Sequence, residues 1–279
     1  MTASAPVDPS LRPAALKPPT PRPPVRPLAA RLFDLVVWGG VIVLLLISFK
    51  PAQLDRAGLL FTHSQNMREF VQEFLRPDFS LWPTYVEQMW LTIQMALWGT
   101  ALAMIVAVPL GFLAARNVTP HWVWFPVRRL LDLLRAVPDL VIGTVFIVAV
   151  GPGPFTGVLA IAFNTGGVLG KLFSEAIEQI ERGPVEGVRA TGAAPAHELV
   201  WGVLPQVAPL WTSFGLYRFE SAARSATVLG LIGAGGIGQT LLDSINGFSY
   251  SQTGAIVVVV VVAVTGIDVL SQVIRSRLT

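Results

Sequence analysis

The chain has 279 residues, of which 53% are hydrophobic and only 13% are charged, and its formal net charge is +3. A soluble protein of this size carries about a quarter charged residues, so the composition indicates a membrane protein and argues against a soluble globular domain. The chain has no cysteine, its three histidines are far apart, and its basic residues do not alternate with aromatic ones. These features leave no pattern for a disulfide, a metal site or a nucleic-acid surface.

Residues 1–28 are dominated by Pro, Ala and Arg. This composition cannot form a packed core and predicts a disordered, partly polyproline tail. The tail lacks the short apolar region and the cleavage site of a secretory signal. Its basic residues precede the first apolar run, which favours a cytoplasmic N-terminus.

The rest of the chain contains about six apolar segments that are long enough to cross a membrane. They are residues 32–49, 90–115, 130–150, 155–176, 207–231 and 256–274. Basic residues follow the second and the last of them, so the positive-inside rule places the N and C termini together in the cytoplasm. The sequence thus predicts an all-α, multi-pass membrane protein.

Between the first two segments the chain is polar, with an amphipathic helical pattern at 67–75. We therefore expect residues 29–84 to hold one transmembrane helix and an extracytoplasmic segment. Residues 85–275 are expected to form the main membrane domain.

Several polar and ionisable residues lie within the predicted membrane segments. Such residues normally face a cavity or a partner helix, and Arg is well suited to bind phosphorus oxyanions. We interpret them as candidates for lining a translocation path, with salt-bridge clamps between helices as the open alternative. The candidates are Arg135, Asp139, Asn164, Arg218, Glu220 and Arg224. Spacing places Glu220 and Arg224 as an i,i+4 pair, and it allows Asp132, Arg135 and Asp139 to share one helix face.

Residues 233–238 match the pattern G-x-G-x-x-G of dinucleotide-binding folds. No βαβ unit surrounds the pattern and no acidic residue follows at the distance that binds a ribose. The glycines are better explained by a helix break or a close helix approach within the membrane. These residues are Gly233, Gly235, Gly236 and Gly238.

A polar stretch at 186–205, EGVRATGAAPAHELVWGVLP, separates two of the apolar segments. Residues 185–190 can form a short helix that Gly192 ends with a left-handed cap. A second short helix is expected at 196–203, where Pro205 would interrupt it. Two short helices outside the membrane predict a compact projection that docks on another protein.

The spacing of Glu186, Gly192 and the Leu204-Pro205 pair resembles the "EAA" loop of ABC importer permeases. In that family the loop forms coupling helices that sit in a groove of a partner ATPase. Gly187 and Val188 replace the two alanines, and Gly202 replaces an isoleucine, which weakens the helices but keeps the turns. The resemblance assigns ATPase coupling to Glu186, Gly187, Arg189, Ala190, Thr191, Gly192, Leu204 and Pro205.

Over residues 85–275 the chain resembles the permeases of the type I ABC importer fold. Residues 92–117, 133–141 and 216–238 are similar to the phosphonate-type permeases. The resemblance implies a homodimer in the bacterial inner membrane, with two ATPase subunits and an extracytoplasmic binding protein. The binding protein would deliver a phosphonate, phosphite or hypophosphite.

The chain has no P-loop and no catalytic constellation, so we expect it not to be an enzyme. The resemblance implies that ATP and Mg²⁺ bind to the partner ATPase and that this chain holds no cofactor. One alternative is a permease of the same fold for methionine, a metal ion or a compatible solute. The other alternative is a membrane protein with no ATPase partner.

Overall fold

The computed structural model describes residues 28–58 and 64–277 of the chain. The predicted disordered tail at 1–28 lies outside these residues, except for Leu28. By their internal contacts the residues divide into two units, 1–65 and 66–279. Each unit is described by itself.

The first unit contains the apolar helix α1 (Leu28–Phe49) and the short 3₁₀ helix η2 (Leu54–Gly58). Within α1, the 18 residues Leu32–Phe49 have none of their side chains buried inside the protein. A helix that is apolar on every face is typical of a membrane span. This segment is the predicted first span.

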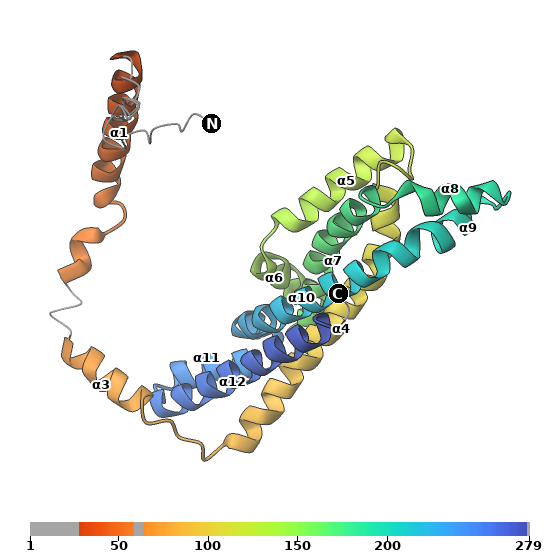
Figure 1. The fold of residues 1–279 in the computed structure, drawn as a ribbon. Coiled ribbons are helices and arrows are strands. Elements are labelled where there is room, and N and C mark those ends of the chain that lie inside the picture. The colour runs from red at the N-terminus through yellow and green to blue at the C-terminus, as the bar shows by residue number, and fades with distance from the viewer. Residues whose placement is uncertain (1–27, 59–63, 278–279) are drawn as a thin grey trace, which may run out of the picture. The chain divides into compact units, whose positions relative to one another are not determined.

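The described residues of the second unit form helices joined by turns and loops, with no strand (Figure 1). Its longest helices pack side by side, and α8 and α9 project from one end of the bundle (Figure 1). The elements from residue 64 onward are α3 (Ser64–Phe74), α4 (Trp82–Ala114), α5 (His121–Ala136), α6 (Asp139–Val150), α7 (Pro154–Glu178), α8 (Arg182–Ala190), α9 (Pro195–His197), the π-helical turn η3 (Glu198–Val203), α10 (Leu204–Leu229), the π-helical turn η4 (Gly230–Ala234), α11 (Ile237–Asn246) and α12 (Tyr250–Arg275).

Five helices in the described residues are long and apolar enough to cross a membrane, and a bent pair raises the number to six. The prediction of an all-α membrane protein with about six spans is therefore confirmed. The predicted third span, however, is not one helix. Instead α5 and α6 meet at a bend of 91°.

Pro138 explains the bend in the third span. Its ring disfavours helical geometry at Val137, which adopts φ −87° and ψ 125°. Pro138 then serves as the residue that precedes α6. Asp132 and Arg135 consequently lie on one helix and Asp139 on the next, so the expectation that all three share one helix face was wrong.

The centre of the second unit is the packing of α4 against α7, where small residues allow a close approach. A Cβ atom on Gly99 would lie 2.6 Å from Ile161 Cγ2, and one on Gly111 would lie 2.7 Å from Phe173 Cβ. Small residues at such contacts are typical of helices in membranes, because association there depends on van der Waals packing.

Aromatic rings fasten α10 to this pair. Trp211 is buried, stacks on Phe173 with ring centroids 4.4 Å apart, and meets Phe112 edge-on at 5.5 Å. Stacked and edge-on arrangements are the favoured geometries for aromatic rings. The three helices thereby share one core.

A glycine-rich break separates α10 from α11. Gly233, Gly235 and Gly236 have φ values of 103°, 82° and 71°, which residues with a side chain rarely adopt. The Thr92 hydroxyl on α4 accepts a hydrogen bond from the backbone N–H of Ile237 at 2.9 Å, so it caps the new helix. Gly238 packs so closely on α10 that a Cβ atom would collide with the carbonyl oxygen of Thr227.

We predict that Gly238→Ala lowers the thermal stability of the detergent-solubilised protein. The added methyl group meets backbone atoms that cannot move aside, and such overpacking costs about 1–3 kcal/mol. Gly266→Ala is the matched control, because no atom lies within 4 Å of a Cβ at that position. If Gly238→Ala and the wild type have the same melting temperature, the packing described at the break is contradicted.

Candidate functional site

The projecting loop begins with α8, and its sequence explains where that helix starts and stops. Pro184 lies in the first turn of α8, where a missing N–H costs no hydrogen bond. At the other end Gly192 adopts φ +76°, and its N–H donates to the Arg189 carbonyl at 3.0 Å. This left-handed geometry turns the chain back toward the bundle.

An ion pair holds the two halves of the loop together. Arg189 donates from Nε and Nη2 to the two carboxylate oxygens of Glu198, at 3.0 and 2.8 Å. This bidentate arrangement fixes direction as well as distance. The hydrogen bonds to Glu198 also raise the pKa of Arg189.

Close backbone packing adds to this ion pair. A Cβ on Gly202 would lie 3.0 Å from the Cα of Val185, so glycine at position 202 lets η3 approach α8. At the base of the loop, the Gln206 amide accepts from the Glu181 N–H at 3.0 Å and donates to the Gly202 carbonyl at 2.6 Å. Non-covalent contacts therefore hold the two halves of the projection together at its middle and at its base.

The expected second short helix at 196–203 is not ended by Pro205. Helix α9 runs into the π-helical turn η3, which continues directly into α10. Pro205 is the second residue of α10, a position where proline is tolerated. The second half of the loop is thus the start of a membrane helix.

Most of the residues assigned to ATPase coupling are on the surface of this projection. Seven of the eight are exposed and Leu204 is half-buried. The exposed ones are Glu186, Gly187, Arg189, Ala190, Thr191, Gly192 and Pro205. Glu198 and Gln206 were not identified from the sequence, because no local pattern links Arg189 to a residue nine positions later.

A cleft of about 690 Å³ separates the projection from the turn that follows α4. Asn117 and Val118 line it on the bundle side. Glu186, Arg189 and Glu198 line it on the side of the loop. Charges of both signs therefore face this opening.

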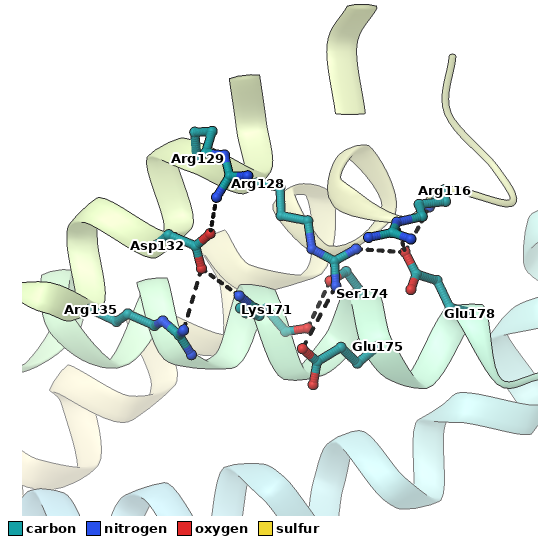
Figure 2. A network of polar contacts seen from close by, with 9 residues as sticks. All are labelled: Arg116, Arg128, Arg129, Asp132, Arg135, Lys171, Ser174, Glu175 and Glu178. Carbon is teal, nitrogen blue, oxygen red and sulfur yellow. Dashed lines mark hydrogen bonds and ion pairs between the residues drawn. The ribbon is translucent and has the colours of Figure 1, made fainter. Parts of the chain in front are cut away.

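A network of ion pairs connects α5 with α7 beside this cleft (Figure 2). Arg128 Nη1 donates to Glu178 at 2.8 Å and Nη2 lies 3.7 Å from Glu175. The same Glu178 oxygen accepts from the backbone N–H of Arg116 at 3.0 Å. Because Glu178 is the last residue of α7, the network fixes the point from which the chain enters the projecting loop.

The network continues along α5. Lys171 of α7 donates to Asp132, which also pairs with Arg129 at 3.3 Å and Arg135 at 3.5 Å (Figure 2). Arg135, a predicted path residue, is therefore part of a structural ion-pair cluster.

Glu220 and Arg224 form the predicted pair, at 3.1 Å, within a larger cluster. Arg224 also meets Asp268 of α12 at 3.2 Å, and Glu220 meets Arg275 at 3.2 Å. These contacts clamp α10 to α12. They support the clamp interpretation that the sequence left open for these two residues.

The remaining path candidates gather where α5 and α6 meet. Asn164 donates to the Val137 carbonyl at 3.1 Å, and Asp139 accepts from the Ser225 hydroxyl at 2.7 Å. Both contacts use groups at the bend, so α7 and α10 hold the broken span in place. Arg218 lies beside Asn164.

Within the described ranges 28–58 and 64–277, no group of three or more His, Cys, Asp or Glu residues could hold a metal ion. The glycine pattern at 233–238 lies in the break between α10 and α11, with no strand before it. This setting differs from that of a dinucleotide-binding turn.

Comparison with known proteins gives a consistent result. The family model described as "binding-protein-dependent transport system inner membrane component" matches residues 107–279. The phosphite transport system permease protein PtxC of Stutzerimonas stutzeri is 40% identical over 236 residues, which cover 84% of this chain and 86% of PtxC. The phosphate-import permease protein PhnE of Mycolicibacterium smegmatis is 45% identical over 188 residues, 67% of this chain and 35% of PhnE.

Among solved structures, an inward-facing MetNI methionine ABC transporter superposes with a TM-score of 0.65. The match covers 72% of this chain and 99% of the other chain, at 19% sequence identity. This similarity confirms the predicted type I importer permease fold.

We predict that Arg128→Gln destabilises the bundle where α7 ends. The Arg128 side chain is 15% exposed, and losing a charged hydrogen bond in such a place costs about 1.5–3 kcal/mol. Arg129→Gln is the control, because its side chain is 68% exposed and surface pairs contribute about 0–1 kcal/mol. Thermal melting in detergent tests the difference, and equal melting temperatures for the two variants would contradict it.

Proposed function

The chain belongs to the binding-protein-dependent transport system inner membrane components, and we propose that it forms the membrane path of an importer for phosphorus oxyanions. As a member of this family it is a multi-pass inner-membrane permease. ATP hydrolysis belongs to a separate chain of the transport system. An ATPase and a binding protein are therefore its partner classes.

The substrate class is supported by two relatives whose matches cover 84% and 67% of this chain. PtxC, aligned over most of both chains, is a phosphite permease by name, and PhnE is a phosphate-import permease. Phosphite, phosphate and phosphonate share a tetrahedral phosphorus with anionic oxygens. A methionine importer shares the fold at only 19% identity, which supports no substrate for this chain.

The projecting loop at 186–205 is the proposed ATPase-docking surface. Seven of its eight residues assigned to coupling are exposed, and the Arg189–Glu198 ion pair joins its two halves. In this proposal Glu186, Arg189 and Gly192 transmit the motion of the ATPase to α7 and α10. A second copy of the chain completes the permease, and ATP with Mg²⁺ binds to the two ATPase subunits.

The function is tested by co-purification from native membranes, followed by an ATPase assay of the complex. We expect hydrolysis to rise when binding protein loaded with phosphite or a phosphonate is added. A co-purified ATPase that responds only to another solute would discard the phosphorus oxyanion and keep the permease. Absence of any ATPase partner under several mild conditions would contradict the docking proposal.

We predict that Gly192→Val uncouples the permease from its ATPase. Valine at φ +76° is a β-branched residue in a conformation it rarely adopts, so the turn between the halves of the loop must move. Binding-protein-stimulated ATPase activity should fall while the level of permease in the membrane stays unchanged.

Gly266→Val is the control for this prediction. Gly266 lies within α12, its φ is ordinary, and no atom of another element lies within 4 Å of a Cβ there. Equal stimulation in the two variants would show that the shape of the turn at Gly192 is not needed for coupling.

A further inference from the structure

Arg218 occupies a core-facing position of α10. Gly215 and Ala222, three residues before it and four after it, are both buried, and residues at this spacing share one helix face. The sequence therefore places a guanidinium toward the interior of the helix bundle. Such a placement is costly unless the charge is paired.

The contacts of Arg218 leave most of its hydrogen-bonding capacity unused. Its Nη2 approaches the Asn164 carbonyl oxygen at 3.5 Å and the Thr165 hydroxyl at 3.4 Å, both at the long limit of a hydrogen bond. Its Nε is buried and has no hydrogen-bond partner. Arginine has five donors, and among the described residues no carboxylate forms an ion pair with them.

The other cations among the path candidates differ in this respect. Arg135 and Arg224 each lie within 4 Å of a carboxylate, whereas no described residue forms such an ion pair with Arg218. Asp139 acts on Arg218 only beyond ion-pair distance, and one of its carboxylate oxygens already accepts the Ser225 hydroxyl at 2.7 Å. The charge of Arg218 is thus only partly compensated.

We propose that Arg218, together with the Thr165 hydroxyl, forms a binding site for a tetrahedral oxyanion at the bend between α5 and α6. This inference rests on the proposed function and adds the residues that contact the anion. The guanidinium fork suits two oxygens of one phosphorus group, and charge-assisted bonds of this kind are strong.

The neighbouring groups fit this role. Asn164 uses its amide N–H₂ on the Val137 carbonyl, so its carbonyl oxygen is turned toward Arg218. Asp139 keeps a negative charge near the site, which weakens anion binding. A transported anion needs such a balance, because it must leave the site as readily as it enters.

The test uses the complete complex, with this chain, its ATPase and its binding protein, in proteoliposomes. Uptake of phosphite and of methylphosphonate is measured beside ATPase activity stimulated by the loaded binding protein. For Arg218→Gln we expect uptake to fall about tenfold or more, the effect of one lost charged hydrogen bond, while stimulated ATPase activity persists. Arg218→Lys keeps the charge but loses the fork, so we expect intermediate uptake and a changed preference between the two anions.

Arg129→Gln removes the same charge from an exposed position and should transport as the wild type does. If the wild type takes up the anions and Arg218→Gln takes them up at the same rate, the inference is overturned and the proposed function stays intact. An equal fall of uptake and ATPase activity would also overturn it, because that result marks a structural role. If Arg218→Gln does not assemble, Arg218→Lys is the deciding variant. Uptake of both anions by Arg218→Lys at the wild-type rate would then overturn the inference. A wild-type complex that takes up neither anion would instead refute the proposed function.

Discussion

The close contact of α4 with α7 is the constraint on which the rest of the bundle depends. Lipid tails are as apolar as leucine side chains, so helices in a membrane gain little from hydrophobic burial and need tight packing. Gly99 and Gly111 provide that packing because Ile161 and Phe173 occupy the space of their missing side chains. Helices α5 and α10 then pack on this pair, and they carry the charged clusters and the projecting loop.

The sequence predicts the features whose causes are local. Apolar length identifies the spans, and Gly192 marks a turn that needs a positive φ. The 91° bend at Pro138 was missed because a hydropathy window averages across α5 and α6 as if they were one span. Pro205 was expected to stop a helix, but it is the second residue of α10 and directly follows the π-helical turn η3, into which α9 runs without a break.

The polar partners could not be predicted, since they come from distant parts of the chain. Arg128 meets Glu178 and Arg224 meets Asp268 only because α5 packs on α7 and α10 on α12. The same limit applies to the six path candidates. The sequence gives their charges, whereas the packing distinguishes the clamped Glu220–Arg224 pair from the weakly bonded Arg218.

Helix α10 is continuous from Leu204 to Leu229, which has a mechanical consequence. Its first residues belong to the projecting loop, and Arg218 lies fourteen residues further along, about 21 Å at the rise of an α-helix. One continuous helix thus joins the loop to Arg218, and Pro209 is a point within it where a backbone hydrogen bond is missing. Beyond Leu229 the glycine break ends this helix, so a movement of α10 need not be shared by α11.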